Sequence, residues 1–134
     1  MRSYAWESGR TLVLFDPIAP LPELPAGERV VCLTCDWHKR STPELGYRVV
    51  APPDGVEAVP ALYEGERALW IPSVQALVVG DGIGALRDPS WLPAGETVDD
   101  VKVKLRSWLD LPVEVVCQTH GDPLDRVSLE RLLA

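Results

Sequence analysis

Four side chains of this sequence are of types that bind metal ions or transfer protons. Cys35 and His38 stand in the segment 34–40, Asp81 lies between two glycines, and His120 lies in a Thr-His-Gly-Asp-Pro run. Thiolate sulfur and imidazole nitrogen are good zinc ligands, and a carboxylate can complete such a site. A hydrolytic zinc site needs about three protein ligands and an open position where water is activated. The four side chains could therefore hold one ion if the fold brings them together.

The same residues allow other interpretations. A cysteine near His120 would resemble a thiolate with its general base, and Cys35 and Cys117 are both candidates. A small thiol beside a buried strand also behaves as a core hydrophobe. Asp81 could accept backbone N–H groups in a tight turn, and His120 could hold its loop by hydrogen bonding. The glycine-rich stretch 80–84 lacks the Lys-Ser/Thr of a phosphate-binding loop, which disfavours conventional nucleotide binding.

Polar residues follow four apolar segments that predict buried strands. These segments are 11–15, 29–34, 76–79 and 113–117. In open α/β sheets, ligands bind at the carboxyl ends of the strands. We therefore expect the polar residues after these strands to converge, with Asp16 after the first, Asp81 after the third and His120 after the last.

The rest of the chain predicts a mixture of parallel and antiparallel units. Residues 29–51 read as strand, short helix and strand, with the helix ending at Gly46. Short apolar segments between residues 56 and 79 predict antiparallel hairpins. The proline-rich segment 18–27 predicts an ordered surface loop. The fold class is therefore α/β (α+β mixed), with mixed β-sheets.

Two helices are predicted near the C-terminus. Apolar residues recur at helical spacing over 98–109, with Thr97 as the N-cap, and Pro112 ends the pattern. A last helix spans 128–134. Four tryptophans are expected in the core and at its rim, and they are Trp37, Trp70, Trp91 and Trp108.

Length and composition favour one globular domain over residues 1–134. A chain of this length buries roughly two-thirds of its unfolded surface, and 46% of its residues are apolar. The net charge of −7, with scattered basic residues, opposes nucleic-acid binding. We find no secretion signal at the N-terminus and no apolar window of about 18 residues for a membrane span. Three cysteines form an odd set, which favours reduced thiols and a cytoplasmic location.

The order of the segments resembles the metallo-β-lactamase-like superfamily. In that family a strand leads into a Thr-His-x-His-x-Asp-His metal motif, a later strand ends in Gly-Asp, and a final strand ends in a His-Gly or Gly-His loop. The matching segments here are 30–40, 76–81 and 115–123. The resemblance covers about residue 11 to the C-terminus. It implies a reduced metallo-β-lactamase-like sandwich with mixed β-sheets and flanking helices.

Most of the family's metal ligands are missing from this sequence. In the first motif, the positions of the family's two early histidines, its aspartate and its last histidine are occupied here by Cys35, Trp37, Lys39 and Arg40. A cationic pair cannot ligate a dication. No histidine lies between His38 and His120, so the family's histidine in a Gly-His-Thr-like turn has no counterpart. Only Asp81, matching the bridging carboxylate, and His120, matching the last histidine, are kept.

These differences predict a pseudoenzyme without a cofactor. Such a protein would bind a small ligand, anionic if Lys39 and Arg40 contact it, or a protein partner. The alternative is a residual hydrolase with one zinc, manganese or iron ion. Its candidate ligands are Cys35, His38, Asp81 and His120. Exposed hairpin edges are compatible with a homodimer.

Overall fold

Nine β-strands form two sheets in the computed structural model, which describes residues 1–134. The first sheet contains, in spatial order, β1 (Tyr4–Ser8), β2 (Thr11–Phe15), β3 (Glu28–Cys32) and β4 (Arg48–Val49). The second contains β5 (Glu57–Val59), β6 (Ala68–Ile71), β7 (Ala76–Val79), β8 (Val115–Gln118) and β9 (Leu124–Asp125). The α-helices are α1 (Thr42–Leu45), α2 (Val98–Leu105) and α3 (Arg126–Leu133). Short 3₁₀ helices span Pro72–Val74, Gly82–Leu86, Pro89–Trp91 and Arg106–Asp110.

Both sheets mix parallel and antiparallel pairs, which confirms the predicted class. In the first sheet β1 and β2 form an antiparallel hairpin, and β3 then pairs parallel to β2 and to β4. In the second sheet β5, β6 and β7 form the predicted antiparallel meander. Strand β8 pairs parallel to β7, so the carboxyl ends of these two strands lie at the same edge.

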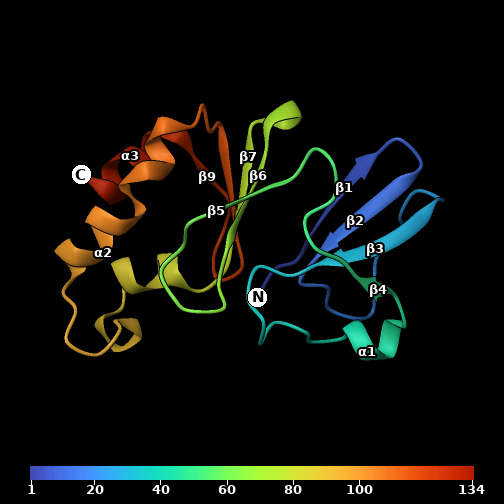
Figure 1. Ribbon diagram of the computed structural model, residues 1–134, viewed down its shortest axis with the longest axis horizontal. Helices are drawn as coiled ribbons and strands as arrows, with labels where there is room; N and C mark the ends of the chain where they lie inside the picture. Colours follow the sequence, from blue (N-terminus) through green and yellow to red (C-terminus); the bar gives the residue numbers. More distant parts are fainter.

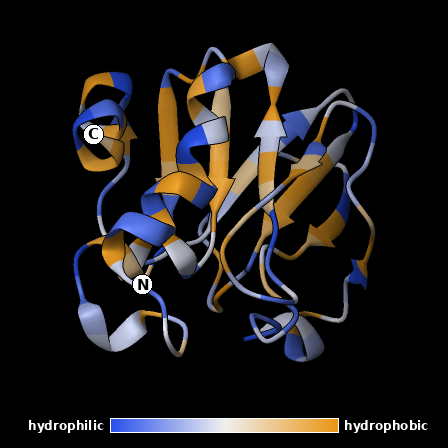
Figure 2. Ribbon diagram, turned by 60° about the vertical axis from the view of Figure 1, so that its left-hand side comes forward, coloured by the Kyte–Doolittle hydropathy of each residue, from blue (hydrophilic) through white to orange (hydrophobic).

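The two sheets pack face to face around a shared apolar layer. Val13 and Phe15 of β2 alternate with Leu12 and Leu14, so each pair faces a different side of the sheet. The inner pair packs with buried residues of β3, β6 and β7. Figure 1 shows the β1–β4 sheet on one side of the β5–β9 sheet and helices α2 and α3 on the other. The strands are mainly apolar, whereas many connecting loops are polar (Figure 2).

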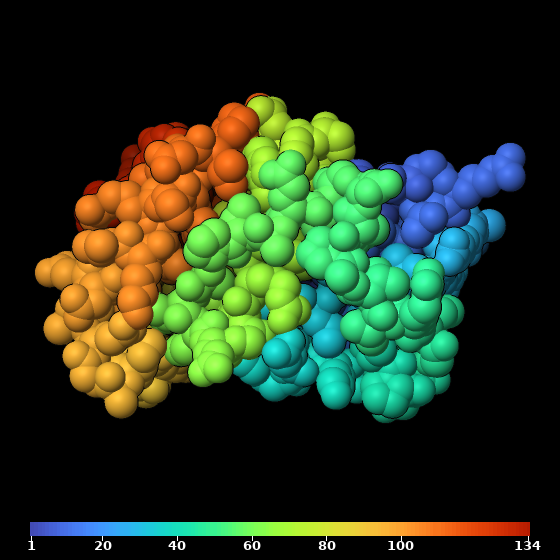
Figure 3. Space-filling view, in the orientation of Figure 1, coloured from blue at the N-terminus to red at the C-terminus, as the bar shows by residue number.

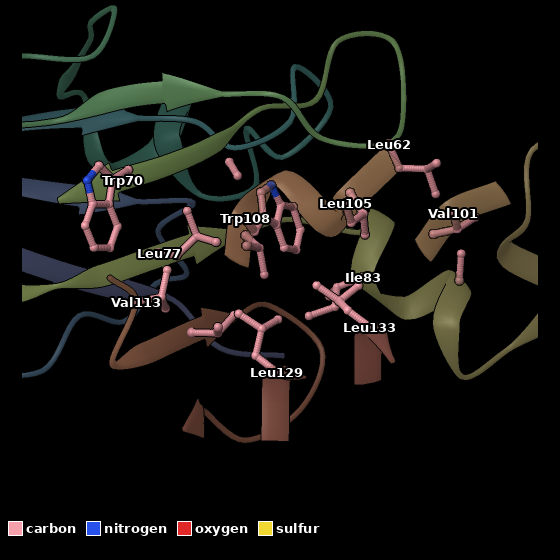
Figure 4. Close-up of a cluster of buried hydrophobic side chains, with 14 residues drawn as sticks. Leu62, Trp70, Leu77, Ile83, Val101, Leu105, Trp108, Val113, Leu129 and Leu133 are labelled. Atoms are coloured by element: carbon pink, nitrogen blue, oxygen red, sulfur yellow. The ribbon is translucent and has the colours of Figure 1, made fainter. Parts of the chain in front are cut away.

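The outer face of the second sheet carries the larger core. Helices α2 and α3 and the 3₁₀ helix Arg106–Asp110 contribute Leu105, Trp108 and Leu129, which pack with Leu77 of β7 (Figure 4). The indole N–H of Trp108 donates to the Pro60 carbonyl at 2.7 Å, so its polar atom is satisfied. The outer face of the first sheet is covered differently. Leu21 and Leu24 of the proline-rich loop and Tyr47 lie against Leu12, Leu14, Val31 and Leu33.

Local signals correctly predicted the start of α2 and the end of α1. Thr97 caps α2 in a capping box with Asp100, and Gly46 follows α1 with φ of 71°, in the left-handed region. The last turn of the predicted helix over 98–109 is 3₁₀ rather than α. Helix α3 begins two residues earlier than predicted, because Asp125 is its N-cap and accepts from the Ser128 N–H at 2.8 Å.

Strand predictions differed from the structure at several places, and strand β9 was not predicted. Strand β1 was not predicted, although Tyr4 and Trp6 alternate with more exposed residues and pack against the inter-sheet layer. Strand β3 ends at Cys32 instead of residue 34, because the Thr34 N–H donates to the Asp16 carboxylate at 2.9 Å. Strand β4 is only two residues long. None of the helices has the length and apolar composition that a membrane crossing requires.

Candidate functional site

Four strand ends converge into one hydrogen-bonded chain of side chains. Asp16 follows β2, His38 follows β3, Asp81 follows β7 and His120 follows β8. His38 Nδ1 lies 3.0 Å from Asp16 Oδ2, and His38 Nε2 lies 2.9 Å from Asp81 Oδ1. His120 Nε2 lies 3.1 Å from the same Asp81 oxygen. The predicted convergence is confirmed.

The turn that carries Cys35 and His38 is held on both sides. On one side, the Thr34 hydroxyl and N–H both donate to the Asp16 carboxylate. On the other, the Asp36 N–H donates to the Gly65 carbonyl at 2.9 Å. The loops around residues 35–40 (cyan) and 60–67 (green) accordingly lie side by side at the lower edge of the molecule in Figure 3. Backbone hydrogen bonds therefore fix the first motif against the second sheet.

His38 is a buried cation between two carboxylates. An imidazole can donate from both ring nitrogens only when it is protonated, and both nitrogens of His38 face carboxylate oxygens. Burial alone would lower the pKa of His38, but the hydrogen bonds to Asp16 and Asp81 outweigh it and raise this pKa to about 11. Burial would raise the pKa of Asp81, yet hydrogen bonds from His38 and Trp37 lower it to about 2. The charged forms of both side chains stabilise each other.

Cys35 completes a group of metal-ligating types. Its sulfur, a nitrogen of His38 and an oxygen of Asp81 all lie within 4.8 Å of one another, whereas His120 is outside this group. Cys35 is fully buried, and this burial raises the pKa of its thiol. Cys117 packs against the inter-sheet layer, and burial raises the pKa of its thiol too. The Cys35 thiol is buried, the Cys117 thiol is partly buried, and both are weakly acidic, which opposes the nucleophilic interpretation.

Glu66 belongs to the site although sequence analysis did not select it. It lies in the turn ahead of the β6–β7 hairpin, and its Oε2 lies 3.7 Å from Cys35 Sγ. The same carboxylate accepts from the N–H groups of Leu62 at 3.0 Å and Gly82 at 2.7 Å. Burial raises the pKa of Glu66. Its hydrogen bonds hold the loop before β6 and the loop after β7 together around Cys35.

The two cationic residues of the predicted anion site, Lys39 and Arg40, have different surroundings. Lys39 is exposed. Arg40 has φ of 45°, and its guanidinium donates to the carbonyl of Asp16 at 2.8 Å and to that of Arg2 at 3.2 Å. The guanidinium is therefore engaged with the backbone beside β2 and with the N-terminal segment.

An aromatic pocket of about 440 Å³ opens above Asp81. Its other lining residues are Trp37, Tyr63 and Trp91. The Trp37 indole N–H donates to Asp81 Oδ2 at 2.8 Å, and the ring centroids of Trp37 and Tyr63 are 6.2 Å apart. The expectation of core or rim tryptophans holds for the buried Trp70 and Trp108, but Trp37 and Trp91 face this pocket.

Solved structures match this arrangement, whereas no protein-family model and no curated protein matches the sequence. VMB-1 matches with a TM-score of 0.61 and 12% identity, over 96% of this chain and 81% of that one. TMB-1 matches with a TM-score of 0.53 and 13% identity over the same shares. This chain has a metallo-β-lactamase-like fold. The chemotaxis sensor ODP, in a peroxy diiron species, also matches, with a TM-score of 0.56 and 13% identity over 98% of this chain and 83% of that one.

In this metallo-β-lactamase-like fold, the donor set at the strand ends fits one metal ion in part. Cys35, His38 and Asp81 supply sulfur, nitrogen and oxygen atoms in one small volume, which suits a single ion better than it suits the expectation of no cofactor. The hydrogen bonds around these atoms oppose an ion. Both nitrogens of His38 and both oxygens of Asp81 already have partners within 3.1 Å. An ion would have to displace the proton that His38 shares with Asp81.

The shifted pKa values of His38 and Asp81 predict that the protein is most stable in mildly acidic solution. His38 has a pKa raised from 6.5 to about 11, so its contribution is complete below pH 6.5 and is lost as the pH rises towards 11. Asp81 has a pKa lowered from 3.8 to about 2, so its contribution is complete above pH 3.8 and is lost as the pH falls towards 2. We expect the free energy of unfolding, measured in urea, to be greatest between these limits. Asp81→Asn should flatten the acid side of the profile, and an unchanged acid side in that variant would contradict the assignment.

Proposed function

We propose that this protein is a non-catalytic, ligand-binding member of the metallo-β-lactamase-like fold. The observation that carries the proposal is the position of the His38 ring, 3.0 Å from Asp16 and 2.9 Å from Asp81. A buried cation of the protein itself thereby pairs with both carboxylates, at the place where an ion would otherwise bind them. A metal ion would then add positive charge to a group that is already paired.

Hydrolysis would also need an open position at a metal where water can be activated. Cys35 is fully buried and His38 is almost so, and the pocket reaches only Asp81 among the three grouped ligands. At the family's remaining positions in the first motif, Lys39 is exposed and Arg40 binds backbone carbonyls. These features support binding of a ligand above Asp81 rather than its hydrolysis.

The accessible part of the site suits a small molecule. The pocket of about 440 Å³ lies within the range of roughly 300–1,000 Å³ that is usual for ligand sites. It combines large apolar ring faces with one carboxylate, a combination that can orient a ligand. A protein partner, a homodimer and a cytoplasmic location remain predictions from the sequence.

A second candidate function is that of a single-metal hydrolase. The grouping of Cys35, His38 and Asp81 within 4.8 Å favours it, and the ion would be zinc, manganese or iron. Bound there, an ion would supply Lewis-acid chemistry. His120, which lies beside Asp81, would then be placed to hold or move a proton at the pocket.

Metal content separates the two candidates. We expect elemental analysis of tag-free protein to find well under one transition-metal ion per chain, because the ligand atoms are already hydrogen-bonded to one another. A chelator should leave the melting temperature unchanged. About one ion per chain, lost in Cys35→Ser and retained in the matched control Cys117→Ser, would overturn the proposal and favour the hydrolase.

A further inference from the structure

The pocket above Asp81 is an incomplete aromatic cage. Trp37 is 49% exposed, and its ring meets that of Tyr63 at 63° with centroids 6.2 Å apart. Trp91 supplies a further wall, and its ring lies nearly perpendicular to the His120 ring, with centroids 5.0 Å apart. The Tyr63 hydroxyl donates to the Trp91 carbonyl, which ties two of the walls together. Aromatic faces at differing angles around one space are the arrangement that attracts a cation through the ring quadrupoles.

The floor of this cage carries negative charge. Asp81 is the only charged residue in the lining, and no lysine or arginine is part of it. Within the Asp16–His38–Asp81 group, two carboxylates pair with one imidazolium, so this group keeps a net negative charge. Two neighbouring guanidinium groups are already paired, because Arg40 binds the Asp16 and Arg2 carbonyls and Arg67 binds the Leu33 carbonyl and the Asp36 carboxylate. The chain as a whole, with a net charge of −7, adds to the attraction for cations.

We propose that this cage binds a small alkylated ammonium cation, with the rings of Trp37, Tyr63 and Trp91 around the cationic group and Asp81 beneath it. The inference rests on the proposed function, since a metal ion at Cys35, His38 and Asp81 would reverse the charge of the floor. It also replaces the anionic ligand expected from Lys39 and Arg40. An alkylated ammonium group suits the site better than a hydrated metal ion because its methyl groups can pack directly against the rings.

Choline and its neutral isostere, with carbon in place of the quaternary nitrogen, test the proposal directly. We would titrate each into ¹⁵N-labelled protein at about pH 8, where an ordinary histidine is neutral, and follow the indole N–H resonances. Choline should shift the Trp37 and Trp91 resonances saturably and bind at least about tenfold more tightly than the isostere, since a desolvated cation over rings gains about 2 kcal/mol. Equal affinities would overturn cation recognition while leaving the pocket as a ligand site.

Two variants of Trp37 separate ring stacking from the hydrogen bond to Asp81. Trp37→Leu should weaken choline binding about tenfold, whereas Trp37→Phe should retain most of it, because phenylalanine keeps a ring face but not the indole N–H. Both variants should fold, since the side chain is half exposed. Equal losses in the two variants, or the absence of saturable choline binding to the wild type, would overturn the proposal. Metal analysis of the same samples tests the proposed function separately. A metal-free protein that does not bind choline would contradict the proposal of a cationic ligand and leave the proposed non-catalytic function untouched.

Discussion

Replacing His38 with leucine should lower the free energy of unfolding by about 3–5 kcal/mol, which is the usual cost of removing one partner from a buried ion pair. The ring is 8% exposed and Asp16 is 3% exposed, so the Asp16 carboxylate would keep its burial and lose its cation. Urea denaturation monitored by circular dichroism measures the change. Lys39→Leu is the matched control, because this neighbouring cation is exposed and should change the stability by less than about 0.5 kcal/mol.

A double-mutant cycle makes this result specific to the pair. Asp16→Asn should cost less stability in the His38→Leu background than in the wild type, because the cation that the carboxylate pairs with is already gone. The Thr34 hydroxyl and N–H remain as partners of residue 16 in both backgrounds. Additive losses in the double variant, or a His38→Leu protein as stable as the wild type, would contradict the buried-cation interpretation.

Gly80→Ala should destabilise the protein by about 1–3 kcal/mol through overpacking at the site. A Cβ at this position would lie 2.5 Å from Cys35 Sγ and 2.8 Å from Thr34 Oγ1, so the loop after β3 would have to move away from the loop after β7. This movement would also separate His38 from Asp81. Urea unfolding measures the loss of stability, and the indole N–H resonance of Trp37, bonded to Asp81, reports on the displacement.

Removing the sulfur that the new methyl group meets should relieve part of the strain. We expect Gly80→Ala to cost clearly less in a Cys35→Ala background than in the wild type, because the closest of the clashing atoms is then absent. Cys117→Ala offers a matched background in which a thiol is removed from the layer between the sheets instead. An equal loss of unfolding free energy on Gly80→Ala in the wild type, Cys35→Ala and Cys117→Ala would show that the new methyl group does not clash with the Cys35 sulfur.

The strand-end placement of the chemistry could be predicted because it depends on short-range patterns. Continuous apolar runs predicted β2, β7 and β8 as buried strands, and the polar residue that ends each run marked the edge where ligands bind. Thr97 and Gly46 predicted helix ends because capping depends on the local backbone and on one side chain. Strand β1 was missed, since its inward residues Tyr4 and Trp6 alternate with exposed residues and form no continuous apolar run.

The partners of the site residues could not be predicted in the same way. Glu66 lies in a turn that reads as solvated, yet its carboxylate is bonded to backbone N–H groups 4 residues before it and 16 residues after it. Trp37 reads equally well as core or rim, and its bond to Asp81 joins residues 44 apart in sequence. The positive φ of Arg40 accompanies a side chain that reaches the Asp16 carbonyl, whereas its cationic character alone suggested an anion site.

The sequence by itself determined the mixed α/β class, the positions of most strands and the expectation that polar residues gather at the strand ends, because these features follow from local burial patterns along the chain. Only the tertiary structure determined which of these polar residues pair with each other and what surrounds them. The packing of the two sheets placed the His38 ring between two carboxylates. It also placed the rings of Trp37 and Trp91 at the pocket above Asp81. Hydrogen bonding and charge pairing depend on distances of about 3 Å between residues far apart in the chain, and those distances exist only after the sheets have packed.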